Sequence, residues 1–191
     1  MSQGMAPTPA GRRLLATAAG LFYSHGINAV GVATIAEQAK VTKKTLYDCF
    51  GSKDGLVVAY LIQRHQDWRH ALETRLATDE ASPLTVFDSY LDHLRREPEV
   101  HGCGFINAAA DLPATHRAMN VIRDHKTQVR HQLDALLPSR YDTATTSTRE
   151  STVTHLFYLL EGATVEAGLL RSLKPLETSR NLAQTLLSTA M

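Results

Sequence analysis

The chain has 191 residues, of which 43% are hydrophobic and 20% are charged, and this balance excludes a disordered or collagen-like protein. No apolar run reaches the ~18–20 residues of a membrane-spanning helix and no secretory signal is visible, so we expect a cytoplasmic protein without a membrane partner. The net charge is only +1, but residues 1–55 carry +3 and residues 56–191 carry −2. The positive charge is therefore concentrated near the N-terminus, which favours a nucleic-acid contact there.

Helical patterning runs through the whole chain and begins at residue 8. Thr8 followed by Pro9 predicts a helix start, because the hydroxyl caps free amides and proline is tolerated at the first helical position. Gly26 supplies the left-handed stop for that helix. Apolar periodicity and Pro or Gly breaks predict helices near residues 9–25, 32–39, 43–50, 53–77, 83–96, 103–111, 114–136, 146–171 and 175–190. No strand signal is present, so the predicted fold is all-α with about nine helices.

Two short helices joined by a tight turn, after a packing helix, are the plan of a helix-turn-helix. The second of them would enter the major groove with its N-terminal residues, which are two hydroxyls and two cations: Thr42, Lys43, Lys44 and Thr45. Tyr47 and Lys53 are suited to phosphate contacts. We therefore predict a DNA-binding domain over residues 9–55, with its motif at about 31–50, and a helical bundle over residues 56–191.

The same segment resembles the TetR family of bacterial transcriptional regulators. The resemblance covers about residues 9–60 and rests on the spacing Ala18-x3-Phe22-x3-Gly26 and Val32-x2-Ile35-Ala36-x4-Val41-Thr42-x2-Thr45-Leu46-Tyr47-x2-Phe50-x2-Lys53-x2-Leu56. It implies an N-terminal DNA-binding domain, a C-terminal domain that binds a small effector, and a homodimer formed by the last two long helices. It also implies phosphate contacts from Tyr47 and Lys53 and groove contacts from residues 42–45.

Three residues depart from the family pattern. Lys40 stands in the inter-helix turn where the family usually has glycine, at a cost of about 1 kcal/mol if its backbone is left-handed. Gly31 replaces the common Ser or Thr cap and brings no hydroxyl for DNA. Asp48 lies on the recognition helix, where it either accepts from a cytosine amine or faces away from DNA.

Candidate effector contacts come from aromatic side chains of the C-terminal part and from one amide. They are Phe87, Tyr90, Phe105, Asn107, Phe157 and Tyr158. Aromatic residues at helical spacing are more often plain core than pocket lining, and a capped helix with a small-residue face is the competing interpretation of the segment around Asn107. The sequence names no effector.

A long apolar stripe near the C-terminus suits a two-fold partner. It comprises Leu156, Leu160, Ala163, Ala167 and Leu170. With the helix at 175–190 it would form a four-helix interface between two copies, although a bundle core within one chain explains the stripe as well. Two copies would also give two recognition helices for a near-palindromic operator.

The predicted function is that of a homodimeric, ligand-responsive transcriptional regulator, in particular a repressor that a small molecule releases from double-stranded DNA. It needs no cofactor and no metal. The alternatives are a DNA-binding protein without an effector and a small all-α enzyme that uses Cys103 as a nucleophile with His101 or His125 as its base. Cys49 and Cys103 are too few for a disulfide framework, and each is either a space-filling thiol or a redox switch.

Overall fold

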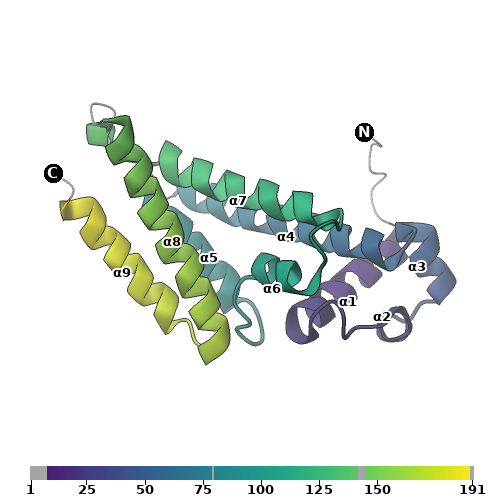
Figure 1. Ribbon diagram of the computed structural model, residues 1–191. Coiled ribbons are helices and arrows are strands. Elements are labelled where there is room, and N and C mark those ends of the chain that lie inside the picture. The colour runs from purple at the N-terminus through teal and green to yellow at the C-terminus, as the bar shows by residue number, and fades with distance from the viewer. Residues whose placement is uncertain (1–7, 79, 142–144, 190–191) are drawn as a thin grey trace. The chain divides into compact units, whose positions relative to one another are not determined.

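The computed structural model describes residues 8–78, 80–141 and 145–189, and it confirms the predicted all-α fold (Figure 1). The helices in the described ranges are α1 (Pro9–His25), α2 (Val32–Gln38), α3 (Lys43–Phe50), α4 (Lys53–Leu76), α5 (Pro83–Arg95), α6 (Gly104–Asp111), α7 (Ala118–Ala135), α8 (Thr146–Leu170) and α9 (Lys174–Thr189), with a short 3-10 helix at Ser139–Tyr141. None of these helices combines the length and the apolar character that crossing a membrane requires.

The described helix boundaries agree with the predicted ones to within one residue except at the start of α7, and the predicted helix end at residue 190 lies outside the described residues. The sequence pattern predicts a helix from residue 114, whereas α7 begins at Ala118. Residues 113–117 form turns instead, and His116 Nδ1 accepts a hydrogen bond from the Ala118 amide at 3.1 Å. The imidazole therefore caps the helix four residues later than the apolar pattern suggested.

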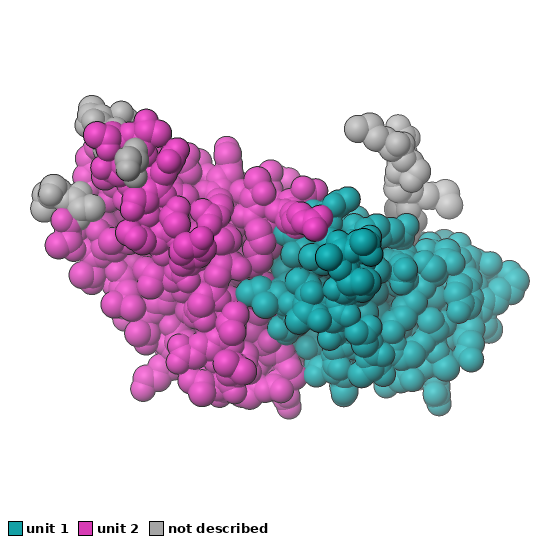
Figure 2. Space-filling view, viewed as in Figure 1, with its two compact units in different colours: residues 1–64, 104–122 teal, residues 65–103, 123–191 magenta. Residues whose placement is uncertain are grey.

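The chain packs as two compact units (Figure 2). Unit 1 comprises residues 1–64 and 104–122, and unit 2 comprises residues 65–103 and 123–191. Unit 1 therefore contains α6 as well as the three N-terminal helices, although residues 65–103 of unit 2 lie between its two segments in the chain. The predicted functional division at residue 55 stays a prediction.

The core of unit 1 is formed where α1 meets the two short helices and the first half of α4. The Thr8 hydroxyl caps α1 by accepting from the Gly11 amide at 3.1 Å, as the sequence predicts. The fully or almost fully buried side chains of this core are Leu14, Ala18, Phe22, Ile35, Leu46, Leu56 and Tyr60. Their burial removes apolar surface from water and holds α2 and α3 against α1.

Unit 2 is a helical bundle in which α9 packs along both α8 and α5. Its core includes Phe87, Leu133, Leu156, Leu160 and Leu176, none of which has measurable solvent exposure. The Arg180 guanidinium of α9 donates to both carboxylate oxygens of Asp88 on α5, at 2.6 and 3.0 Å. This two-point contact fixes the position of α9 more strictly than apolar packing alone.

Two glycines let the segment before α6 lie directly on α8. A Cβ atom at Gly168 would lie 2.8 Å from the carbonyl oxygen of His101, and a Cβ atom at Gly102 would lie 2.4 Å from the carbonyl oxygen of Thr164. Both distances are shorter than van der Waals contact, and the opposing atoms belong to the backbone. Close approach at this crossing therefore depends on the absence of side chains.

Gly168→Ala is expected to lower the free energy of unfolding by about 1–3 kcal/mol, because the new methyl group overpacks a backbone contact. The measurement is the midpoint of urea or thermal unfolding. Gly20→Ala is the matched control, since no atom lies within 4 Å of a Cβ at that helical position. There the same substitution is expected to stabilise by up to about 1 kcal/mol, and equal effects at both positions would contradict this explanation of the crossing.

Candidate DNA-binding site

The N-terminal end of α3 presents an exposed edge of hydroxyl and ammonium groups. Thr42 caps the helix, with its Oγ1 atom 3.1 Å from the Thr45 amide and 2.9 Å from the Thr45 hydroxyl. Thr42, Lys43 and Lys44 are exposed, whereas Leu46 is completely buried and anchors the opposite face of the helix. The predicted groove-reading edge is thus held on the surface by local capping and by a single core contact.

The two lysines of this edge differ in their surroundings. Lys44 Nζ lies 2.7 Å from Asp48 Oδ2, one turn further along α3, and both side chains are well exposed. Within the described ranges, Lys43 forms no ion pair. Lys43 therefore offers an uncompensated positive charge, while the charge of Lys44 is shared with a carboxylate that lies beside it.

Tyr47 and Lys53, the predicted phosphate contacts, lie in different surroundings. The Tyr47 side chain is 49% exposed, so its hydroxyl is accessible from solvent. Lys53 is half-buried at the start of α4, and its Nζ donates to the carbonyl oxygen of Ile27 at 2.6 Å. Lys53 thus supports the loop between α1 and α2, and its predicted phosphate contact stays a prediction.

In the turn between α2 and α3, the backbone of Lys40 is left-handed, which is the case that the sequence analysis considered for this position. Lys40 has a φ of +53°, and the Val41 amide donates to the Ala36 carbonyl oxygen at 3.0 Å. The turn closes α2 with a hydrogen bond typical of a glycine-terminated helix, although a lysine occupies the position. Its exposed side chain adds a cation near α3.

The predicted effector residues do not gather in one place within either unit. Phe87, Tyr90 and Phe157 are buried in unit 2, whereas Phe105 is buried and Asn107 half-buried in unit 1. Tyr158 is 62% exposed. Two consecutive residues of the predicted set, Phe157 and Tyr158, therefore lie in different surroundings, one in the core and the other in solvent.

A buried polar cluster around Tyr90 was not predicted from the sequence. The Tyr90 hydroxyl lies 3.0 Å from His125 Nε2, and His125 Nδ1 lies 3.1 Å from His65 Nδ1. Burial, followed by the positive charge of Arg69, lowers the pKa of His65. Trp68 packs edge-on against His125, and its buried Nε1 has no hydrogen-bond acceptor in the described part of the chain. The sequence analysis named Tyr90 as an effector contact and His125 as a possible base, but it could not place them together, because the members of the cluster lie on three different helices.

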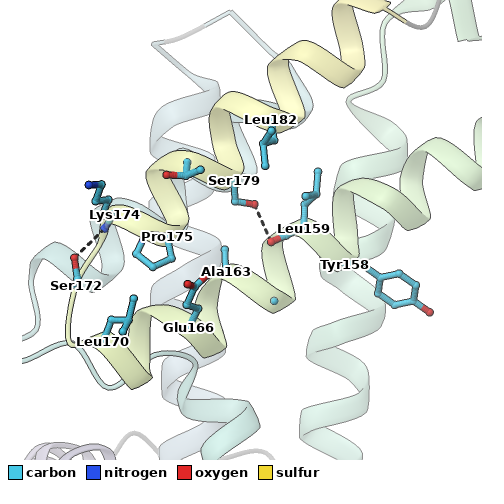
Figure 3. A pocket seen from close by; sticks show the side chains of 12 residues that line it. Tyr158, Leu159, Ala163, Glu166, Leu170, Ser172, Lys174, Pro175, Ser179 and Leu182 are labelled. Atoms are coloured by element: carbon cyan, nitrogen blue, oxygen red, sulfur yellow. Dashed lines mark hydrogen bonds between the residues drawn. The ribbon is translucent and has the colours of Figure 1, made fainter.

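The predicted dimer stripe is mostly buried within its own chain. Leu156, Leu160, Ala163 and Ala167 are buried, whereas Leu170 is 60% exposed. A groove of about 480 Å³ runs between α8 and α9, and Leu170 and Leu182 are among the side chains that line it (Figure 3). The apolar surface of α8 that solvent reaches is therefore a different face from most of the predicted stripe.

The cysteines lie in contrasting positions. Cys49 is exposed on α3, whereas Cys103 is buried and its Sγ accepts a hydrogen bond from Lys126 Nζ at 3.4 Å. Lys126 in turn pairs with Glu161 at 2.7 Å. The structure thus pairs Cys103 with a lysine and not with the histidine that the enzyme alternative requires.

Comparisons with known proteins agree with the geometry of α2 and α3. Residues 14–60 match the family described as bacterial regulatory proteins, tetR family. The fold is similar to those of a TetR transcriptional regulator from Legionella pneumophila (TM-score 0.77, 21% identity, 95% of this chain and 98% of that chain) and of reduced NemR from E. coli (TM-score 0.73, 22% identity, 92% and 95%). No curated protein sequence matches significantly.

The similarity to one solved structure extends to the sequence of the whole chain. SCO4454, a TetR-family transcriptional regulator from Streptomyces coelicolor, superposes with a TM-score of 0.83. The two sequences are 32% identical, and the alignment covers 97% of this chain and 96% of that one. Both the helix-turn-helix and the helical bundle are included in this match. The chain therefore belongs to the TetR family of transcriptional regulators.

Proposed function

We propose that this TetR-family regulator is a ligand-responsive repressor that binds a near-palindromic operator as a homodimer in the cytoplasm and that has no catalytic role. A small molecule bound in the C-terminal part would favour the state that does not bind DNA. The observation that carries the proposal is the exposed edge of α3, where Thr42 and Lys43 stand on a helix anchored by Leu46.

The chemistry of this edge suits the major groove. A lysine ammonium can contact guanine O6 and N7 or a phosphate, and threonine can donate to or accept from a base edge. However, α3 has only eight residues, and one such helix contacts few base pairs. Specific binding by this protein therefore requires two recognition helices and a second copy of the chain.

The surface of α8 and α9 supports a second copy as the partner. Five of the seven large apolar side chains that are exposed in the described ranges lie on these two helices: Tyr158, Val165, Leu169, Leu170 and Leu182. Exposed apolar surface gathered on one pair of helices is typical of a subunit interface. We place the dimer contact on this face, next to the groove in Figure 3.

The Tyr90 cluster supports an effector contact in unit 2. A buried indole N–H without an acceptor is unfavourable, so an effector with a carbonyl or other acceptor group gains a hydrogen bond at Trp68 Nε1. Tyr90, His125 and His65 provide further polar atoms beside it. A small, partly polar molecule with an aromatic or aliphatic body matches these surroundings.

The DNA contact is tested with fragments that the wild-type protein selects from genomic DNA. Lys43→Ala with Lys44→Ala is expected to weaken binding and to reduce the slope of log K against log salt by about 0.9 for each phosphate that the variant no longer neutralises. Asp48→Asn is expected to strengthen binding, because it removes the carboxylate that shares the charge of Lys44. Fluorescence anisotropy at several salt concentrations gives both quantities.

Arg69→Ala with Arg95→Ala is the matched control, because it removes two exposed cations from unit 2. Its salt slope should equal that of the wild type. Selection of no fragment by the wild-type protein would refute the proposed function. Unchanged binding by the double lysine variant would refute only the assignment of these residues.

Leu169→Glu is expected to convert the protein to a folded monomer, because it places a charge in the proposed dimer contact at a side chain that is 77% exposed in the single chain. Sedimentation velocity measures the change, and circular dichroism checks the fold. Ile62→Glu, at an apolar side chain of α4 that is 42% exposed, is the control and should remain dimeric. A dimeric Leu169→Glu protein would place the interface elsewhere.

An effector is expected to change the fluorescence of Trp68, the only tryptophan of the chain, because it would contact the indole ring. Metabolites that release the selected DNA should therefore also shift or quench this emission, with the same concentration dependence. Tyr90→Phe keeps the ring and removes the hydroxyl next to His125, so it should weaken the response to polar effectors. Release of DNA without any change in emission would place the effector site elsewhere.

A further inference from the structure

The loop between α1 and α2 determines where α2 begins. Its side chains Ile27 and Val30 are 4% and 5% exposed, so the loop forms part of the core of unit 1. Gly31 caps α2 without any side-chain hydrogen bond, and its carbonyl oxygen accepts from the Ile35 amide at 3.2 Å. The start of α2 is thus specified by the loop backbone and not by a capping side chain.

Charged side chains from two other helices hold the peptide groups of this loop. The Asp111 carboxylate accepts from the Ile27 amide at 2.7 Å, and Lys53 Nζ donates to the Ile27 carbonyl oxygen at 2.6 Å. Asp111 is the last residue of α6, and Lys53 is the first residue of α4. Both polar backbone atoms of one buried residue are therefore satisfied by charged partners, which gives hydrogen bonds stronger than those between neutral groups.

Two further features tie Asp111 to the loop. Asn28 Nδ2 donates to the Asp111 carbonyl oxygen at 2.6 Å, so the side chain and the main chain of Asp111 both bind the loop. A Cβ atom at Gly26, whose φ is +83°, would lie 2.9 Å from Asp111 Oδ2. The glycine thus permits both the turn and the close approach of the carboxylate.

We propose that Asp111 is a positioning residue for DNA binding, which holds α2, and through α2 the reading helix α3, in the orientation that fits the major groove. The proposal rests on the proposed function. It follows from the packing of α1, α2 and α3 on one another, because a displaced α2 cannot leave α3 in place. Asp111 itself touches no DNA in this role.

Loss of the Asp111 charge and loss of its positioning contact are expected to change DNA affinity in opposite directions, which makes the proposal testable. Removal of a negative charge strengthens binding to a polyanion when electrostatics is the only change. Asp111→Ala and Asp111→Asn remove the same charge, but only the asparagine keeps an oxygen that accepts from the Ile27 amide. A positioning role therefore predicts that the two variants differ.

The experiment measures DNA affinity and amide hydrogen exchange on the full-length protein, with a duplex selected by the wild type. Asp111→Ala is expected to bind this duplex about tenfold more weakly, with an unchanged salt slope. Its Ile27 amide is expected to exchange about tenfold faster. Asp111→Asn is expected to retain at least the wild-type affinity and most of the protection. Asp124→Asn, which removes an exposed carboxylate from unit 2, is the charge control and should leave both quantities unchanged.

Wild-type affinity of Asp111→Ala, or equal weakening by Asp111→Ala and Asp111→Asn, would overturn the proposal. If Asp111→Ala unfolds at the assay temperature, Asn28→Ala replaces it, since it removes one bond to Asp111 and leaves the carboxylate in place. A DNA affinity of Asn28→Ala that lies between the wild-type value and a tenfold weaker one supports the proposal. A wild-type affinity of Asn28→Ala overturns it. Hydrogen exchange at Ile27 requires no DNA, so a wild type that selects no duplex refutes the proposed function separately.

Discussion

The burial of Leu46 is the contact on which the orientation of the DNA-reading helix depends. An isolated helix of eight residues is not stable in water, so α3 takes its geometry from its neighbours. Leu46 is the one fully buried side chain of α3, and the helix packs against both α1 and α2. Because the anchor is so small, every contact that fixes α2 also fixes α3. The two bonds of Asp111 to the loop before α2 belong to this set.

The polar residues on the exposed edge of α3 differ in how far their charges and hydrogen bonds are already satisfied within the chain. The threonines bond to each other and are thereby oriented, Lys44 shares its charge with Asp48, and Lys43 stays uncompensated among the described residues. Exposed pairs such as Lys44 with Asp48 contribute little to stability, so little free energy opposes separation of the two side chains. The arrangement combines a strong local positive charge with a nearly neutral molecule, which limits nonspecific attraction to nucleic acid.

In unit 2, α8 is apolar on two faces, and they serve different purposes. One face carries Leu156 and Leu160 into the core of the chain, and the other exposes Val165 and Leu169. A helix that is apolar on more than one side gives no sequence signal for the side that meets a partner. For this reason the apolar stripe was recognisable as buried surface, but which side chains of α8 are buried in the chain's own core and which are exposed depended on where α5 and α9 pack.

The sequence by itself determined the all-α class, most helix boundaries, the Thr8 cap and the exposed edge of α3. These features arise from local rules, namely apolar periodicity, capping hydroxyls and turn-forming residues, which act within a few positions of the chain. The tertiary structure alone decided that Lys53 binds the Ile27 carbonyl, that Asp111 binds the Ile27 amide, and that Trp68 lies against His125. These partners are 26 to 84 residues apart, or on different helices, so only the packing of whole helices brings their polar atoms together.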